Sequence, residues 1–175
     1  MAWLLDLDGV MWLGDQPIYG SADAVARLRA RGDRVVFLTN NSSLTVGDYV
    51  LKLRAMGVPA DESDVITSAQ AAASMLAPSS TALVCAGLGM DEALQRRGVR
   101  TVRSGRADAV VVGWHREFDY ERLTAAYRAV AAGARLIGTN DDATYPTPTG
   151  MVPGGGAILA AVSYATGQPA EVAGK

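Results

Sequence analysis

The amino-acid sequence predicts an α/β protein whose strands form a mainly parallel sheet. Short apolar runs, which are typical of buried strands, alternate along the chain with longer amphipathic segments of helical period. The spacing leaves room for a helix between successive strands, and such crossovers are right-handed and join parallel strands. Hydrophobic residues make up 49% and charged residues 19% of the 175 residues, as in a folded globular chain.

The first part of the chain alternates strands and helices. We expect strands at residues 3–5, 35–38 and 65–67, and helices at residues 21–31 and 45–56. Ser21 can cap the first helix, and Gly32 can end it in a left-handed conformation. Gly57 stops the second helix in the same way.

A second α/β group follows a boundary at residues 78–80. We expect strands at residues 83–85, 109–112 and 136–137, and helices at residues 91–97, 119–132 and 157–165. Residues 138–156 are rich in Thr, Asp, Pro and Gly and predict a long shaped loop. Residues 168–175 start another strand, which leaves the first group with about three strands where sheets average five to six. We therefore expect a C-terminally truncated chain.

Composition and charge argue against several classes of function. The net charge is −2 and no long basic run occurs, so nucleic acid is not an expected partner. No apolar run approaches the roughly 20 residues that span a bilayer, and the start does not read as a signal peptide. Cys85 is the single cysteine and lies in an apolar run, which favours a reducing, cytoplasmic setting. His115 is the single histidine, which leaves carboxylates as the main candidates for catalysis.

Two carboxylates follow the first strand, in the segment DLDGV at residues 6–10. Residues two apart on a strand point to the same side, so Asp6 and Asp8 are expected to converge on one crevice, and Gly9 lets the backbone turn. One carboxylate could attack an electrophile or bind a cation while the other carries a proton. Two repelling carboxylates also favour a divalent cation, and Mg²⁺ is the hard, oxygen-seeking choice. An acidic turn that caps the next segment is the alternative, and the pattern alone leaves both open.

Thr39 and Asn40 follow the second predicted strand. Their hydroxyl and amide groups suit a phosphoryl or carboxylate oxygen. Ligands of parallel sheets lie beyond the carboxyl ends of the strands, so this segment and the two aspartates are expected to face one crevice. Taken alone, Thr39 and Asn40 could instead stabilise a turn or cap a helix. Their expected position beside the two aspartates favours a binding role.

Other polar residues carry weaker functional interpretations. Asp141 and Asp142 are adjacent and would point apart in a strand, which favours a solvated loop. Three glycines at residues 154–156 could bind an anion at a helix N-terminus, although a flexible turn is favoured. A lone terminal Lys175 is typically solvated. Packing is favoured over substrate contact for three further side chains: Trp114, His115 and Tyr145.

Four segments occur in a characteristic order: DLDGV at residues 6–10, TNNS at 39–42, GTNDDATYP at 138–146 and AGK at 173–175. With them the chain resembles the haloacid dehalogenase superfamily, in its NagD and p-nitrophenyl phosphatase-like branch, over essentially its whole length. The resemblance implies a Rossmann-like parallel-sheet core, incomplete here, with an inserted α/β cap of the C2 type. The core would take residues 1–78, the cap residues 79–168, and residues 169–175 would return to the core.

The resemblance also assigns roles to the motif residues. Asp6 would be the nucleophile that takes the phosphoryl group, and Asp8 the acid that protonates the leaving alcohol and then activates water. Asp6 and the backbone carbonyl of Asp8 would hold Mg²⁺. Thr39 and Asn40 would bind the transferred phosphoryl oxygens, and Lys175 matches the lysine of the third motif.

The cap of this branch selects the leaving group, and Asp142 and Tyr145 lie in the loop that would face the substrate. The fourth motif of the family, an acidic Gly-Asp segment with further Mg²⁺ ligands, should follow Lys175 and does not occur in the sequence. We therefore expect a phosphatase as the parent protein, and a fragment that is weakly active or inactive and binds Mg²⁺ poorly.

The expected function is Mg²⁺-dependent hydrolysis of a small phosphomonoester metabolite through an aspartyl-phosphate intermediate. The alternatives are a non-catalytic module that binds a phosphometabolite, or another reaction of the superfamily, phosphomutase or dehalogenase. Asp8 argues against dehalogenation, which has no alkoxide to protonate. The expected partner is a small phosphorylated metabolite, and neither a nucleic acid nor a membrane is expected as a partner. The chain could also form a homodimer through the cap. The pattern does not identify the phosphoester.

Overall fold

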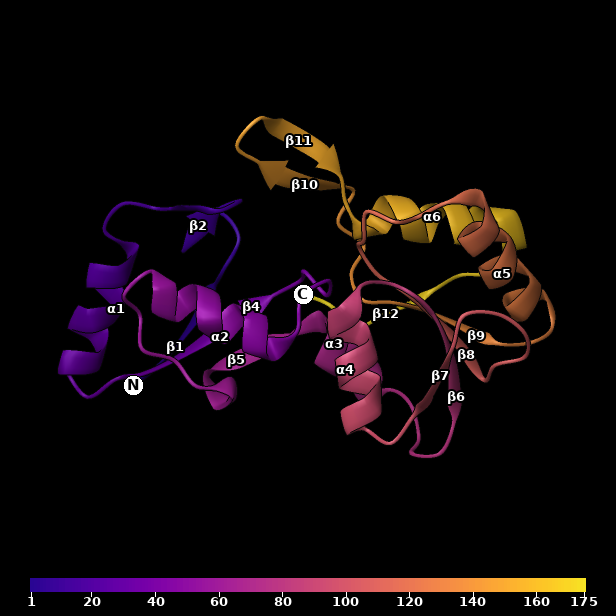
Figure 1. Cartoon of the computed structure of the whole chain (residues 1–175), viewed down its shortest axis with the longest axis horizontal. Helices are drawn as coiled ribbons and strands as arrows, with labels where there is room; N and C mark the ends of the chain where they lie inside the picture. Colours follow the sequence, from indigo (N-terminus) through magenta and orange to yellow (C-terminus); the bar gives the residue numbers. More distant parts are fainter. The chain divides into compact units, whose positions relative to one another are not determined.

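The computed structural model describes all residues, 1–175, and they divide into two compact units (Figure 1). Unit 1 consists of Met1–Thr39, Val46–Thr67 and Pro146–Val152. Unit 2 consists of Asn40–Thr45, Ser68–Tyr145 and Pro153–Lys175. Each unit contains its own parallel sheet, so the predicted α/β class is confirmed.

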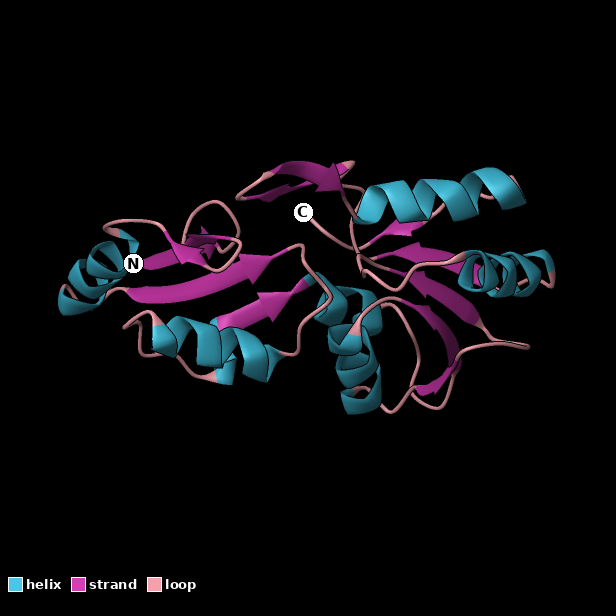
Figure 2. Ribbon diagram, turned by 45° about the horizontal axis from the view of Figure 1, so that its top comes forward, coloured by secondary structure: helices cyan, strands magenta, loops and turns pink.

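Unit 1 contains a three-stranded parallel sheet in the order β1-β4-β5 (Figure 2). Its strands are β1 (Ala2–Asp6), β4 (Arg34–Thr39) and β5 (Val65–Thr67). Its helices are α1 (Ser21–Ala30), α2 (Val46–Ala55) and the short 3-10 helix η1 (Glu62–Asp64). Because the three strands are parallel, their carboxyl ends lie at one edge of the sheet.

One face of this sheet supports the hydrophobic core of unit 1. Val35 and Phe37 alternate along β4 with residues of the other face, as a period of two requires. Phe37 packs with Val25 from α1 and with Tyr49 and Leu53 from α2, and all four are buried. The amphipathic periodicity of the two helices therefore fixes which face of the sheet they cover.

The other face of the unit 1 sheet is exposed along its outer strands, β1 and β5, and buried at Val36 of the central strand. Leu4 lies opposite Val36, and Ile66 lies opposite Leu38, so these side chains share that face. Leu4 is 65% exposed and Ile66 48% exposed. Parallel sheets ordinarily have both faces covered, whereas on this face the outer strands of the sheet expose apolar side chains.

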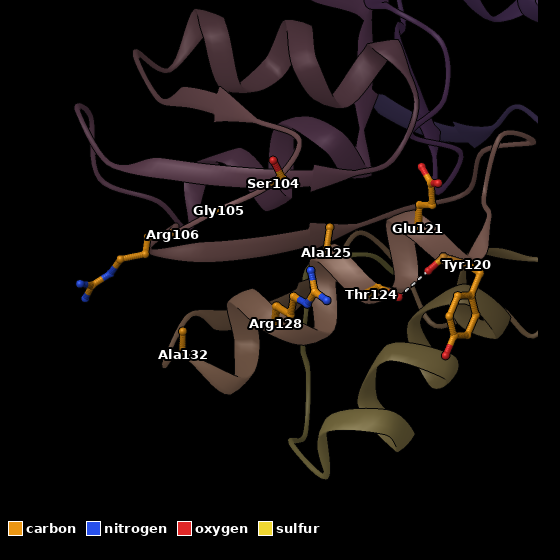
Figure 3. Close-up of a pocket in the computed structure, with 9 residues that line it drawn as sticks. All are labelled: Ser104, Gly105, Arg106, Tyr120, Glu121, Thr124, Ala125, Arg128 and Ala132. Carbon is orange, nitrogen blue, oxygen red and sulfur yellow. Dashed lines mark hydrogen bonds between the residues drawn. The ribbon is translucent and has the colours of Figure 1, made fainter.

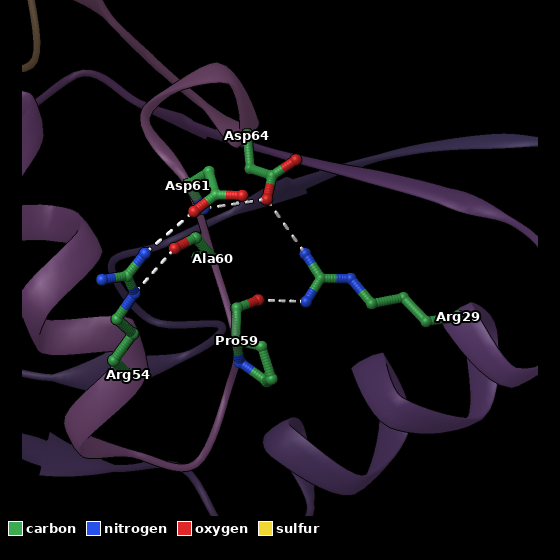
Figure 4. Close-up of polar contacts among 6 residues, drawn as sticks. All are labelled: Arg29, Arg54, Pro59, Ala60, Asp61 and Asp64. Atoms are coloured by element: carbon green, nitrogen blue, oxygen red, sulfur yellow. Dashed lines mark hydrogen bonds and ion pairs between the residues drawn. The ribbon is translucent and has the colours of Figure 1, made fainter.

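Two arginines connect the ends of α1 and α2 to the loop before β5 (Figure 4). Arg29 donates to the carbonyl oxygen of Pro59 and pairs with Asp64 at 3.4 Å. Arg54 pairs with Asp61 at 2.8 Å. Exposed ion pairs contribute only about 0–1 kcal/mol each, so these contacts fix the position of the loop more than they add stability.

A short hairpin that the sequence did not predict follows β1. It consists of β2 (Trp12–Leu13) and β3 (Gln16–Pro17), which pair antiparallel. Two residues per strand are too few for a period of two to be recognised. The ammonium of Lys52 donates to the carbonyl oxygen of Gly14 at 2.6 Å and so connects the hairpin to α2.

Unit 2 contains a five-stranded sheet in the order β12-β9-β8-β6-β7. Its strands are β6 (Thr81–Cys85), β7 (Arg100–Val102), β8 (Ala109–Val112), β9 (Arg135–Gly138) and β12 (Glu171–Val172). Its helices are α3 (Ser68–Ser74), α4 (Leu88–Arg96), α5 (Tyr120–Ala131) and α6 (Gly155–Thr166). All the strand pairs are parallel.

Helices cover both faces of this sheet, with α3 and α4 on one side and α5 and α6 on the other (Figure 1; Figure 2). Val111 of β8 packs in the cluster with α3 and α4, whereas Val110 and Val112 pack in the cluster with α5 and α6. The continuous apolar run in β8 follows from this arrangement, because both of its faces are buried.

The predicted loop at residues 138–156 contains a two-stranded sheet of β10 (Thr144–Thr147) and β11 (Gly150–Pro153). The hydroxyl of Thr147 donates to the carbonyl oxygen of Gly150 at 2.6 Å across the turn. Pro and Thr in this segment interrupt the alternation of apolar and polar residues that predicts a strand, so the sequence did not predict β10 and β11. No helix of the chain combines the length and the apolar character that crossing a lipid bilayer requires.

We expect Leu53→Ala to lower the free energy of unfolding by about 2–5 kcal/mol, because it leaves a cavity in the core of unit 1. Leu53 is fully buried, whereas Leu51 on the same helix is 65% exposed. Leu51→Ala is therefore the matched control and should change stability by no more than about 0.5 kcal/mol. Urea denaturation followed by circular dichroism measures both, and equal effects would contradict the assigned face of α2.

Candidate functional site

Asp6 ends β1, and Asp8 lies in the turn that follows. Asp6 accepts a hydrogen bond at Oδ1 from the backbone N–H of Leu7 at 2.7 Å. The turn closes through the N–H of Met11, which donates to the carbonyl oxygen of Leu7 at 2.8 Å. Gly9 has a φ of 80°, a left-handed conformation that favours glycine. The turn thus holds two half-buried carboxylates at the carboxyl edge of the sheet.

Two donors hold the carboxylate of Asp8. Thr39 Oγ1 donates to Asp8 Oδ2 at 3.1 Å, and the indole Nε1 of Trp12 donates to Asp8 Oδ1 at 3.0 Å. Thr39 is buried at the carboxyl end of β4. The structure therefore brings together the acidic segment and the threonine at one sheet edge, as the sequence predicted for Asp8 and Thr39.

Trp12 is a site residue that sequence reasoning missed. Its ring stacks on Tyr49 with centroids 6.4 Å apart, and the ammonium of Lys52 lies 4.5 Å from the ring centroid. These contacts fix the indole, which in turn fixes Asp8. The sequence shows only that Trp12 lies four residues after Asp8. That spacing predicts a side-chain contact within a helix, but not in a turn.

In unit 2, Asn40 is the centre of a second polar group. Its Nδ2 donates to Asp142 Oδ2 and to the carbonyl oxygen of Lys175, both at 2.8 Å. Its Oδ1 accepts from the backbone N–H of Lys175 at 3.1 Å. Asn40, Asp142 and Lys175 are far apart in the sequence, and the structure places them in direct contact.

Three further residues make this arrangement possible. The carbonyl oxygen of Asn40 accepts from Ser68 Oγ at 2.6 Å and from Asn140 Nδ2 at 2.7 Å. A Cβ on Gly174 would lie 2.6 Å from the carbonyl oxygen of Thr139 and 2.9 Å from Asn40 Oδ1. Only glycine therefore lets the segment before Lys175 approach so closely. Sequence reasoning had named neither Ser68 nor Asn140 as a site residue.

Tyr145 belongs to the same unit and contacts Asn41 and Trp114. Its hydroxyl accepts from Asn41 Nδ2 at 3.4 Å, and its ring stacks on Trp114 with centroids 5.1 Å apart. The guanidinium of Arg116 lies 5.9 Å from the ring centroid of Trp114. An aromatic surface with a polar rim thus forms beside Asn41.

The glycines at residues 154–156 serve close packing. The N–H of Gly156 donates to the carbonyl oxygen of Asp142 at 2.8 Å, and a Cβ on Gly156 would lie 2.2 Å from the carbonyl oxygen of Asp141. The segment that carries Asp142 therefore packs directly on the start of α6. Close packing against residues 140–144 therefore accounts for the three glycines, and no bound anion is needed to explain them.

The chain supplies part of a ligand set for a divalent cation. No group of three or more His, Cys, Asp or Glu side chains is arranged to hold a metal ion. Asp6 and Asp8 offer carboxylate oxygens, the donors that Mg²⁺ prefers. The donors therefore fit Mg²⁺, which one or two carboxylates commonly hold while water fills the rest of its octahedral shell.

A cavity of about 580 Å³ beside α5 lies apart from all the predicted site residues (Figure 3). It is lined by Ser104, Gly105, Arg106, Tyr120, Glu121, Thr124, Ala125, Arg128 and Ala132. The hydroxyl of Thr124 donates to the carbonyl oxygen of Tyr120 at 2.8 Å and is thus used within the helix. Most of the surface that faces the cavity comes from apolar atoms, although several of the lining residues are polar or charged.

Burial changes the acid–base properties of the single cysteine and the single histidine. It raises the pKa of the Cys85 thiol to about 11, so the thiol stays protonated at neutral pH. Burial also lowers the pKa of His115, and the nearby Arg122 and Arg103 act in the same direction. His115 is therefore neutral at pH 7.

Comparison with known proteins identifies relatives of the chain. A family model described as haloacid dehalogenase-like hydrolase matches residues 3–100. An acid sugar phosphatase of Staphylococcus saprophyticus is 37% identical over 169 residues, which cover 95% of this chain and 65% of that protein.

Solved structures agree with these relatives. A glycerol phosphate phosphatase of Mycobacterium tuberculosis, solved in complex with magnesium, is 36% identical with a TM-score of 0.92 over 99% of this chain and 54% of its own. A p-nitrophenyl phosphatase of Archaeoglobus fulgidus is 29% identical with a TM-score of 0.88 over 98% of this chain and 67% of its own. The chain thus spans between half and two thirds of these relatives.

We expect the free energy of unfolding to fall as the pH drops below 6.5, the ordinary pKa of histidine, because the folded state keeps His115 neutral. The unfolded chain binds a proton there that the folded chain does not, with a slope of at most about 1.4 kcal/mol per pH unit. His115→Asn keeps an N–H donor without titrating and should remove this part of the slope. Urea denaturation between pH 7.5 and pH 5.5 measures it, and identical slopes would contradict the lowered pKa.

Proposed function

The chain belongs to the haloacid dehalogenase-like hydrolase family, and from this premise we propose that it carries the nucleophile and the proton carrier of a Mg²⁺-dependent phosphatase acting on small phosphomonoesters. The observation that carries the proposal is the turn after β1, where Asp6 and Asp8 lie two residues apart and Thr39 donates to Asp8 at 3.1 Å. A phosphoryl transfer needs an oxygen nucleophile, a proton carrier and donors for the phosphoryl oxygens. The relatives named above are phosphatases, which supports this reaction type.

We assign Asp6 as the nucleophile. One of its carboxylate oxygens attacks phosphorus, and the bond from phosphorus to the substrate alcohol breaks. The bond between Asp6 Oδ1 and the N–H of Leu7 fixes the carboxylate for this attack. The product is an aspartyl phosphate together with the released alcohol.

We assign Asp8 as the proton carrier. Its protonated carboxyl group gives a proton to the departing alcohol oxygen, and the resulting carboxylate then takes a proton from water. The water oxygen attacks phosphorus, inorganic phosphate leaves, and the Asp6 carboxylate is restored. Trp12 orients the carboxyl group of Asp8 for both transfers, and Thr39 does so before the substrate binds.

Mg²⁺ would be held by Asp6 and by the backbone carbonyl of Asp8. When bound, it supplies positive charge to the phosphoryl oxygens during transfer. The family resemblance assigns Thr39 and Asn40 to the phosphoryl oxygens and the ammonium of Lys175 to their negative charge. In this structure Thr39 Oγ1 donates to Asp8 and Asn40 Nδ2 donates to Asp142 and Lys175, so a bound phosphoryl group would have to replace these acceptors. Water and the substrate's phosphoryl oxygens would fill the remaining positions of its octahedral shell.

Selection of the substrate is assigned to the predicted cap, residues 79–168, with Asp142 and Tyr145 in its substrate-facing loop. The stacked rings of Trp114 and Tyr145 support this assignment, because they form an aromatic surface with a polar rim. A cytoplasmic setting agrees with the buried thiol of Cys85. The predicted homodimer through the cap stays a prediction.

Asp6→Asn tests the nucleophile. We expect phosphate release from p-nitrophenyl phosphate and glycerol phosphate to fall by at least about 10³-fold, because an amide oxygen cannot form the phosphoenzyme. Asp141→Asn removes an exposed carboxylate outside the proposed chemistry and should leave the rate within about twofold of the unsubstituted protein. The assay uses the protein with all residues that its gene encodes, with Mg²⁺ and with a chelator.

An unchanged rate for Asp6→Asn would overturn the proposed nucleophile. Release of halide from haloacids without release of phosphate would favour dehalogenation. Tight binding of a phosphoester without any Mg²⁺-stimulated hydrolysis would favour a binding module.

Trp12→Phe tests the orientation of Asp8. Loss of the indole N–H should lower kcat about tenfold and leave KM nearly unchanged, because the carboxyl group acts in the transition state. Trp3→Phe is the matched control, since its indole donates to Asp33 at 3.2 Å, away from Asp8. A rise in KM with kcat unchanged would show that Trp12 serves substrate binding instead.

A further inference from the structure

A cavity of about 450 Å³ in unit 2 gathers three arginines around the buried His115. Arg103 follows β7, Arg116 follows β8, and Arg122 lies in the first turn of α5. We call this cavity the arginine pocket. It lies within unit 2 and shares Trp114 and Arg116 with the aromatic surface assigned to substrate selection, whereas the proposed phosphatase function does not use Arg103, Arg122 or His115.

The charges of the arginine pocket leave an excess of positive charge. Arg103 is neutralised by Asp91, at 2.6 Å. Neither Arg116 nor Arg122 forms an ion pair, and Glu117 is the remaining carboxylate of the lining. Two guanidinium groups therefore face one carboxylate. Guanidinium groups without a partner bind carboxylate and phosphate oxygens through planar pairs of N–H donors.

The start of α4 adds to this field. Gly87 is the N-cap of α4, and no side chain caps the helix there. Gly87 and Leu88 both line the arginine pocket. The N–H groups of Gly89 and Met90 already donate to the carbonyl oxygens of Ser43 and Gly87, so this side adds only the partial positive charge of the helix N-terminus.

His115 supplies a separate indication of a ligand. Its Nδ1 lies 2.9 Å from the carbonyl oxygen of Gly113 and must donate, because a carbonyl oxygen only accepts. The neutral ring therefore presents Nε2 as an acceptor, and Nε2 is buried without a hydrogen-bond partner. His115 is 4% exposed and forms part of the pocket lining. A buried polar atom without a partner is uncommon in native proteins and calls for a donor.

We propose that the arginine pocket binds a small oxyanion that also carries a hydroxyl group. Arg116 and Arg122 contact the charged oxygens, and the hydroxyl donates to His115 Nε2. Nε2 has less than 1 Å² of exposed area, so neighbouring side chains have to move before a ligand hydroxyl reaches it. The ring of Phe118 packs edge-on against the His115 ring, with centroids 5.9 Å apart. The shared chemistry includes hydroxycarboxylates and inorganic phosphate.

Isothermal titration calorimetry with four probes tests the ligand chemistry. Glycolate and inorganic phosphate combine an oxyanion with a hydroxyl and should bind at millimolar concentrations. Acetate lacks the hydroxyl and should bind about fivefold more weakly than glycolate, whereas ethylene glycol lacks the charge and should not bind. Tighter binding of glycolate would indicate a carboxylate ligand, and tighter binding of phosphate would indicate a phosphate ligand. Binding of either one supports the proposal. Binding of neither at about 50 mM overturns it, and acetate binding as tightly as glycolate overturns the role of Nε2.

Arg122→Gln tests the location of the site. It should weaken the probe that binds by about tenfold or more, because a charged donor is lost. Arg128→Gln is the matched control on the same helix, since Arg128 lines the cavity of Figure 3 and not the arginine pocket. Equal affinities of the two variants overturn the proposal. Circular dichroism spectra show that both variants are folded.

The single histidine gives a second readout. Only one imidazole contributes to the nuclear magnetic resonance spectrum, so its Nε2 signal is assigned without ambiguity. Addition of glycolate or phosphate at pH 7.5 should shift this signal, and the Arg122→Gln variant should require about tenfold more ligand for the same shift. A signal that stays unchanged while calorimetry detects binding places the ligand elsewhere and overturns the proposal.

Discussion

The parallel register of β1 and β4 is the constraint on which the candidate site of unit 1 depends. Asp6 lies opposite Leu38, so both strands reach the same edge together, and Thr39 comes within 3.1 Å of Asp8. A slip of one residue would turn Phe37 out of the core, because successive side chains of a strand point to opposite faces. The buried side chains of β4 therefore fix the position of a polar contact at its end.

In unit 2, hydrogen bonds of one residue, Asn40, hold the polar groups together. Asn40 binds both the N–H and the carbonyl oxygen of Lys175 while its own carbonyl accepts from Asn140. A single amide side chain thus connects the last residue of the sequence to a segment more than a hundred residues earlier. Gly174 is needed for this contact, since a Cβ there would lie 2.6 Å from a carbonyl oxygen of Thr139.

The two units carry opposite electrostatic character in their polar groups. The turn after β1 presents two carboxylates, whereas the arginine pocket presents two guanidinium groups against one carboxylate. Carboxylates that act in proton and phosphoryl transfer need donors that orient them, and Trp12 and Thr39 provide these for Asp8.

The sequence by itself determined the α/β class, the order of the long elements and the edge at which Asp6, Asp8 and Thr39 lie, because hydrophobic periodicity and glycine stops are local properties of the chain. It did not determine the hairpin of β2 and β3 or the sheet of β10 and β11, whose few residues pair through backbone contacts that leave little pattern. Only the tertiary structure decided that the indole of Trp12 donates to Asp8. It also decided that Arg116 and Arg122 line one cavity with His115, whose Nε2 accepts no hydrogen bond. These contacts join residues from different elements, and their formation depends on packing that no short stretch of sequence encodes.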